Sequence, residues 1–173
     1  MAFTVEDETG LPEANAYVTV AEFKAYWDDR GFDYSSFTDP DDFQVAIIKA
    51  TDYIENRFRT RFKGSREFED QSLSFPRLRL YDEDGRLVTG LPIRLKHATS
   101  EYTKRALSAE LSPDFVTDDT GQRVVRKKEV VGPIEEETQY VEAGGIAIYR
   151  PYPTADALLE EYIIASGGRT MRA

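Results

Sequence analysis

The densest run of basic residues outside residues 123–128 lies at positions 57–66, and aromatic residues are interleaved with it. Cations that neutralise phosphates, beside rings that stack on bases, are the usual means of binding single-stranded nucleic acid. The same pattern arises when cations gather at the C-terminal end of a helix whose phenylalanines enter the core. Both interpretations stay open here. The candidate nucleic-acid patch consists of Arg57, Arg59, Arg61, Lys63 and Arg66, with Phe58, Phe62 and Phe68 among them.

Two groups of acidic residues have the chemistry of metal ligands. Residues 82–85, Asp-Glu-Asp-Gly, resemble the start of a calcium loop, but the glycine comes fourth instead of sixth and no glutamate follows at the twelfth place. This spacing is typical of a tight turn between strands. Asp39, Asp41 and Asp42 are explained by the positive end of a helix dipole. We predict no metal site and no cofactor.

The chain has one histidine, His97, and no cysteine. This excludes zinc ribbons, iron–sulfur clusters, disulfide scaffolds and cysteine nucleophiles. A general base at His97 is conceivable, but its neighbours Arg94 and Lys96 indicate a solvated or intersubunit face. No serine lies in a Gly-x-Ser-x-Gly turn, and no glycine-rich phosphate loop occurs. We therefore predict no catalytic residues and no enzyme.

The charge balance opposes general nucleic-acid binding. The sequence has 22 Lys and Arg against 32 Asp and Glu, which gives a formal net charge of −10. Domains that neutralise phosphates are usually basic, whereas an acidic surface repels polyanions. No stretch approaches the ~20 apolar residues of a membrane span, and the first residues do not form a signal peptide. We expect a protein that is soluble when made.

The elements that must position these residues are mainly helical. Thr19 precedes Glu22 by the capping-box spacing, Asp39 and Pro40 begin a second helix, and Pro92 begins a third. Two short runs around residues 82–85 predict a hairpin. The predicted fold is mainly α: a bundle of three to four helices with an inserted β-hairpin and a long antiparallel β excursion. We expect an N-terminal arm at 1–18, one domain at 19–166 with the excursion at about 122–142, and a flexible tail at 167–173.

The β excursion carries adjacent opposite charges. Basic residues dominate its first half, and a run of glutamates opens its second half. This pattern suits pairing between subunits in a ring, although it is equally compatible with a solvated ribbon. The candidate intersubunit residues are Arg123, Arg126, Lys127, Lys128, Glu135, Glu136 and Glu137.

Several short motifs, taken in order, resemble a family of tailed-bacteriophage proteins. The opening residues 5–18 match first, followed by Ala50-Thr51-Asp52-Tyr53-Ile54, Phe75-Pro76-Arg77, Asp82 to Gly85, Val131-Gly132-Pro133-Ile134, Pro151-Tyr152-Pro153 with Asp156-Ala157-Leu158-Leu159, and Arg172-Ala173. Members are labelled DnaT-like single-stranded-DNA-binding proteins, and the family looks related to head–tail connector, or head-completion adaptor, proteins. Two positions depart from the family pattern. Phe75 stands where the family shows tryptophan, and Leu91-Pro92 is shifted from the place where the family more often shows a short polar loop.

The resemblance implies a closed ring of about a dozen copies beneath the portal of the filled capsid. It also implies that the C-terminal segment docks into the portal. Paired glycines before a basic tail provide a mobile attachment. The matching portal-docking residues are Gly167, Gly168, Arg169, Thr170, Met171, Arg172 and Ala173.

Two functions follow from these patterns. The main expectation is a structural virion protein of the neck: a ring adaptor between portal and tail, made in the host cytoplasm, whose acidic channel passes DNA. Its expected partners are its own copies, the portal protein and the next tail protein. The alternative is a single-stranded-DNA-binding replication accessory, which the basic run at 57–66 favours.

Overall fold

A computed structural model describes residues 2–37, 39–112, 124–130, 135–140 and 150–164. The chain divides into two compact units. The first contains Met1–Leu111 with Pro151–Ala173, and the second contains Ser112–Arg150. Each unit is described below by itself.

The first two helices begin at the caps that the sequence predicts. In α1 (Val20–Asp28), the Thr19 hydroxyl accepts a hydrogen bond from the Glu22 amide at 3.1 Å, and the Glu22 carboxylate accepts one from the Thr19 amide at 2.7 Å. In α2 (Pro40–Phe58), the Asp39 carboxylate accepts a hydrogen bond from the Asp41 amide at 3.0 Å. These bonds satisfy amides that have no partner inside the helix, so the caps set where both helices begin.

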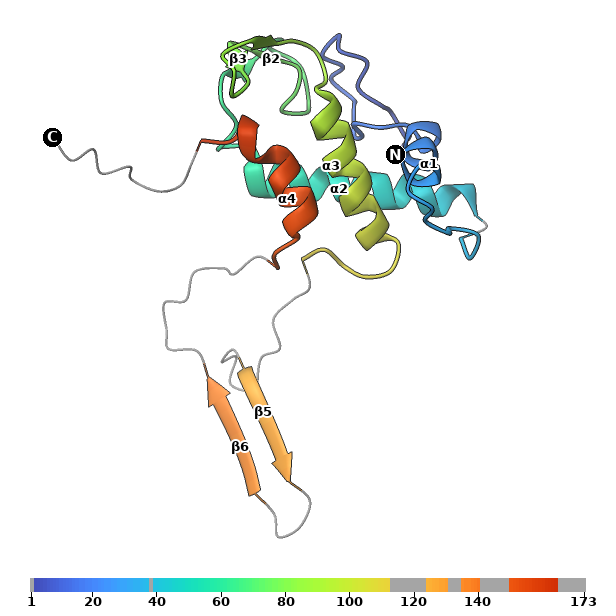
Figure 1. Ribbon diagram of the computed structural model, residues 1–173, viewed down its shortest axis with the longest axis vertical. Helices are drawn as coiled ribbons and strands as arrows, with labels where there is room; N and C mark the ends of the chain where they lie inside the picture. Colours follow the sequence, from blue (N-terminus) through green and yellow to red (C-terminus); the bar gives the residue numbers. More distant parts are fainter. Residues whose placement is uncertain (1, 38, 113–123, 131–134, 141–149, 165–173) are drawn as a thin grey trace, which may run out of the picture. The chain divides into compact units, whose positions relative to one another are not determined.

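Helix α3 (Ile93–Ala106) packs against α1, α2 and α4 (Pro153–Leu159), and Figure 1 shows it between α1 and α4. It is a central helix that contains buried hydroxyl residues. Thr99, Ser100 and Thr103 each donate to the carbonyl four residues earlier, at 2.9, 3.0 and 2.7 Å. These hydroxyls therefore need no partner from the neighbouring helices, and small side chains let those helices approach closely.

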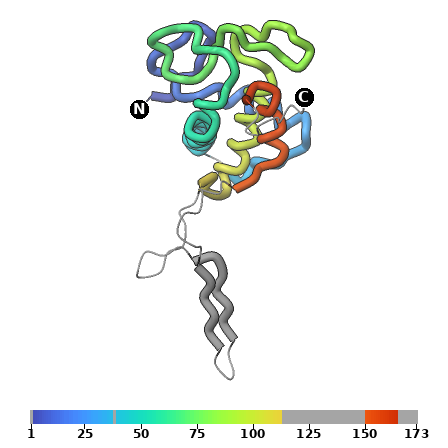
Figure 2. The backbone as a smooth tube through the Cα atoms, turned by 90° about the vertical axis from the view of Figure 1, so that its left-hand side faces the viewer, coloured from blue at the N-terminus to red at the C-terminus, as the bar shows by residue number. Residues whose placement is uncertain are grey.

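Residues 59–92 contain little regular structure. They include two short antiparallel pairs: β1 (Ser65–Arg66) with β2 (Arg77–Leu78), and β3 (Leu80–Tyr81) with β4 (Leu87–Val88). The β3–β4 hairpin lies at the position that the sequence predicts. Figure 2 shows this segment and the N-terminal residues at the same end of the helices. The Ser72 hydroxyl joins them by donating to the carbonyl of Ala14 at 2.6 Å.

Buried polar side chains hold these irregular segments in place. The Glu6 carboxylate accepts hydrogen bonds from the amides of Gly10 and Leu11. Arg77, which is 8% exposed, donates to the carbonyls of Phe62, Lys63, Gly64 and Ser74. Each buried backbone group would otherwise lose its hydrogen bond to water without replacement.

The core draws on these segments as well as on the helices, so the prediction of a helical bundle is wrong. Tyr17, Phe75 and Leu80 lie outside every helix and are at most 1% exposed. Among the described residues, α1 and α4 have only 9 and 7 residues, too short to bury an extended stripe. Residues 14–18, which were expected within an irregular arm, are also buried. The helices alone do not enclose the hydrophobic core.

One ion pair joins α2 to α4. Arg57 donates to both carboxylate oxygens of Asp156, at 2.8 and 3.0 Å, and to the hydroxyl of Tyr53 at 2.9 Å. Asp156 also accepts a short hydrogen bond from Tyr102 on α3. The rings of Tyr53, Tyr102 and Tyr152 pack together, with centroids 5.0 to 5.8 Å apart. Three helices therefore meet at one carboxylate.

The second unit contains a two-stranded antiparallel sheet, made of β5 (Val124–Val130) and β6 (Glu135–Tyr140). Lys128 is the register partner of Glu137, and Glu129 is the partner of Glu136. The register is irregular between Val124 and Arg126. We call this sheet the ribbon.

The second unit is inserted between two segments of the first unit that a hydrogen bond joins. The Tyr152 hydroxyl donates to the Leu111 carbonyl at 2.9 Å, and both groups are buried. The chain therefore leaves and re-enters the first unit at neighbouring points.

We predict that Asp156→Asn lowers the free energy of unfolding by about 3 kcal/mol, because it leaves the Arg57 guanidinium, 15% exposed, without its carboxylate. Urea denaturation measures this change. The control is Asp84→Asn, which removes an exposed ion pair with Arg86 and should change the free energy by less than about 0.5 kcal/mol. Equal effects of the two substitutions would contradict the structural role of Asp156.

We also predict that residues 112–150 can be replaced by a linker of about six residues without unfolding the first unit. A linker of that length spans about 20 Å when extended, and shortening a loop lowers the entropy cost of closing it. Circular dichroism and cooperative thermal unfolding should be retained. Loss of the cooperative transition would show that the first unit depends on the inserted one.

Candidate functional site

Three residues of the predicted nucleic-acid patch, Arg57, Arg61 and Lys63, are partly buried in the first unit, and Arg59 and Arg66 are exposed. Arg57 pairs with Asp156, as described above. Lys63 donates to the carbonyl of Glu161 at 2.6 Å, and Arg66 donates to the carbonyl of Gln71 at 2.7 Å. Arg59, at the C-terminal cap of α2, is exposed. These contacts stabilise the end of α2 and the segment after it.

The aromatic residues of this patch do not form a stacking platform. Phe58 and Phe62 are each 3% exposed, and their rings pack in the core 6.3 Å apart. Phe68 is 39% exposed, but its ring lies directly against Gly10. Arg61 is only partly exposed, with its guanidinium 5.8 Å from the Phe58 ring. Bases could not reach the faces of Phe58 and Phe62 without local unfolding.

A second group of cations and rings lies around α1, and it was not identified from the sequence. Lys24 lies over the ring of Phe43 at 4.7 Å, and Lys104 lies over the rings of Trp27 and Phe32 at 4.1 and 4.2 Å. The density of aromatic residues between positions 23 and 43 was the available signal. Exposed acidic residues surround this group in the sequence, which disfavours a bound polyanion. They are Asp28, Asp29, Asp33, Asp39, Asp41 and Asp42.

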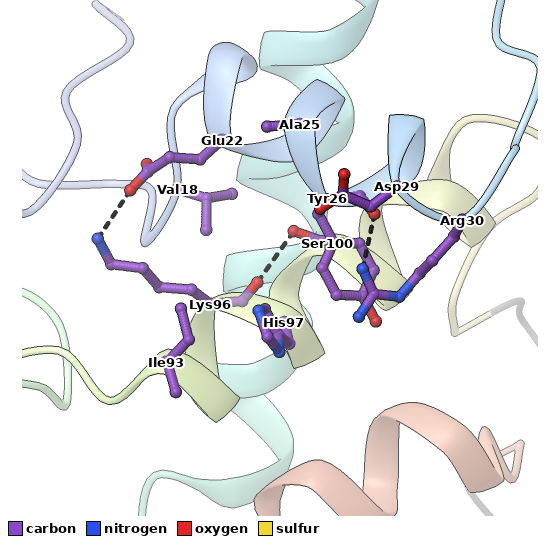
Figure 3. A pocket seen from close by; sticks show the side chains of 10 residues that line it. All are labelled: Val18, Glu22, Ala25, Tyr26, Asp29, Arg30, Ile93, Lys96, His97 and Ser100. Atoms are coloured by element: carbon purple, nitrogen blue, oxygen red, sulfur yellow. Dashed lines mark hydrogen bonds and ion pairs between the residues drawn. The ribbon is translucent and has the colours of Figure 1, made fainter.

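His97 belongs to a groove of about 310 Å³ between α1 and α3 (Figure 3). Its ring centroid lies 4.7 Å from that of Tyr26. Burial lowers the pKa of His97, and the neighbouring Arg30 cation lowers it further. Burial also raises the pKa of Tyr26 to about 12, with a contribution from its hydrogen bond to Glu101. Both shifts favour the uncharged form of the rings, which pack against one another.

A half-buried carboxylate on α2 organises the segment around residue 74. Glu55 accepts a short hydrogen bond from Tyr17, and it accepts from the amide and hydroxyl of Ser74 at 3.1 and 2.7 Å. Burial is the main cause that raises the pKa of Tyr17 well above its ordinary value, and Glu55 contributes. Since Ser74 is fully buried, this group has a structural role.

Within the part of the chain that the structure describes, no three His, Cys, Asp or Glu side chains gather to hold a metal ion. No helix in the same residues is long and apolar enough to cross a membrane. Residues 82–85 form the tight turn of the β3–β4 hairpin, where the Asp82 carboxylate accepts a hydrogen bond from the Arg86 amide at 2.8 Å.

The candidate intersubunit residues lie on the two strands of the ribbon. Residues 126–128 belong to β5 and residues 135–137 belong to β6. Arg123 and the predicted portal-docking residues 167–173 lie outside the described residues. The intersubunit and portal-docking roles remain predictions.

Comparison with protein families gives one match, which extends over residues 1–173. The family is described as "Putative DnaT-like ssDNA binding protein". Comparisons with curated proteins and with solved structures gave no match. The description agrees with the alternative function expected from the sequence, and it does not mention a head–tail connector. Because the match covers the whole chain, this protein belongs to the DnaT-like ssDNA-binding family.

Proposed function

We propose that this protein is a non-catalytic structural subunit that assembles with its own copies through the ribbon. In this proposal it forms a ring adaptor in the neck of a tailed-phage virion, between the portal protein and the next tail protein. The observation that carries the proposal is the inserted two-stranded sheet.

A two-stranded ribbon is marginally stable by itself in water. In the described residues, β5 and β6 each have one strand neighbour, so each strand has an open edge. Open edges are templates for pairing with another chain. A neighbouring copy that covers such an edge would supply the stability that the ribbon lacks alone.

The charges on the ribbon favour contact between different parts of identical subunits. Its first strand carries three consecutive cations, and its second strand carries three consecutive glutamates. A contact between unlike surfaces of one chain repeats around a ring or along a filament. The net charge of −10 further supports a ring that lets DNA pass without holding it.

The second candidate function is single-stranded-DNA binding, and the family description favours it. Its basis in this chain is the basic run at 57–66, in which Arg59 and Arg66 are exposed. The internal contacts of the partly buried Arg57 and Lys63 oppose this function, as does the acidic net charge.

We predict that the purified chain self-associates with rising concentration, and that Arg126→Glu, Lys127→Glu and Lys128→Glu together weaken self-association at least about tenfold. Light scattering after size exclusion measures the mass. The control combines Lys49→Glu, Arg59→Glu and Arg105→Glu, which makes the same change in net charge at exposed positions of the first unit. Equal loss in both variants, or a chain that is monomeric at every concentration, would contradict assembly through the ribbon.

Absence of the chain from purified virions would contradict its placement in the neck.

We expect single-stranded DNA to bind more weakly than about 10⁻⁴ M at physiological salt, because the acidic surface repels phosphates. Fluorescence anisotropy with a labelled oligothymidine, at about 50 mM and about 200 mM salt, measures the binding. Tight binding that falls steeply with salt would instead support the second candidate. Loss of that binding in Arg59→Glu, with Arg105→Glu as the control, would locate it at the 57–66 run.

A further inference from the structure

The groove between α1 and α3 combines apolar and charged side chains, and one of its cations, Arg30, forms no ion pair among the described residues. Its apolar side chains include Val18, Ala25 and Ile93, and the last of these is 63% exposed. Figure 3 shows Val18 and Ala25 on one side, with Ile93 and His97 on α3 across from them. A volume of about 310 Å³ is at the lower end of the range for ligand sites.

Among the described residues, the side chain of Arg30 is bound only to Tyr26. Its guanidinium lies 3.6 Å from the centre of the Tyr26 ring and donates to the Tyr26 carbonyl at 2.8 Å. No carboxylate among the described residues forms an ion pair with it. A guanidinium held against a ring and hydrogen-bonded to a carbonyl is already oriented, so its remaining N–H groups can bind an incoming carboxylate at little entropic cost.

The other charged groups that line the groove are Glu22, Asp29 and Lys96. Lys96 is paired with Glu22 at 2.8 Å, and His97 is mainly neutral near pH 7 because burial and Arg30 lower its pKa. Asp29 also lines the groove, and because it is exposed, solvent screens its repulsion of an incoming carboxylate. The groove therefore suits an apolar side chain that is followed closely by a carboxylate.

The chain itself contains a segment with this chemistry. Residues 131–134, Val-Gly-Pro-Ile, link the two strands of the ribbon, and glutamates follow directly at 135–137. Segments that link paired strands are usually rich in polar turn residues, so valine and isoleucine here are unexpected. The register partners of Glu135 and Glu136 are Val130 and Glu129, so neither glutamate has a cation opposite it.

We propose that the α1–α3 groove receives this segment from a second copy of the chain. Ile134 enters beside Ile93, and the carboxylate of Glu135 or Glu136 binds Arg30. The contact joins two different surfaces, so it repeats from copy to copy and can close a ring. This inference rests on the proposed self-assembly and names one contact that contributes to it.

Disulfide trapping tests the contact, because the chain has no cysteine of its own. The variants Ile93→Cys and Ile134→Cys are mixed and oxidised, and only a contact between copies can produce the mixed dimer. A chain that carries both substitutions should form a ladder of linked oligomers. The control replaces Ile93→Cys by Val45→Cys, which is also an exposed apolar position, 50% exposed, on α2. We expect at least about tenfold less mixed dimer with the control.

A charge exchange tests the ion pair separately. Arg30→Glu alone, and Glu135→Arg with Glu136→Arg, should each weaken self-association about tenfold, and the combined variant should recover most of it. Light scattering measures the oligomer in each case.

The outcomes separate this inference from the proposed function. If the natural chain forms oligomers but no mixed disulfide appears, or if Val45→Cys is trapped equally well, the groove is not the docking site and the proposed function stands. Failure of the combined charge variant to recover also overturns the Arg30 contact. If the natural chain is monomeric at all concentrations, both the inference and the proposed function are overturned.

Discussion

The Arg57–Asp156 ion pair is the interaction on which the rest of the first unit depends. It joins residues 99 positions apart, and through Tyr102 it also reaches α3. An ion pair with so little exposure is stable only when further hydrogen bonds satisfy both groups. Here Tyr53, Tyr102 and the Tyr152 amide provide them. Because Arg57 binds Asp156 within the first unit, its charge stabilises the fold and is less available to a phosphate.

The features that the sequence predicts well are those set by neighbours along the chain. Thr19 with Glu22, and Asp39 with Pro40, define helix starts because both partners lie within one turn. The β3–β4 turn follows from Asp82 and Gly85 for the same reason. The compact irregular segments could not be predicted, because their buried polar groups bind partners far away in sequence. Glu55 and Arg77 illustrate this, because each binds a segment that contains little regular structure. The prediction of a helical bundle is wrong because it did not include these segments in the core.

The candidate surfaces divide in the same way. A sequence shows the charges at positions 57–66, but it does not show that Lys63 and Arg66 bind carbonyl oxygens of the same unit. The α1–α3 groove was equally hidden, since it exists only where Tyr26 and Arg30 meet His97 across two packed helices. By contrast, the sequence alone shows that the two strands of the ribbon carry opposite charges. The register makes Lys128 the partner of Glu137.

The hydrogen bond between Tyr152 and Leu111 has a mechanical consequence. Any pull on the inserted residues enters the first unit through the two covalent connections beside this bond. From there the load passes along α3 on one side, and through α4 to Asp156, Arg57 and α2 on the other. The tension is thus divided between two paths that meet again at the tyrosine cluster. Because two connections share the load, each carries less tension than one connection alone would carry.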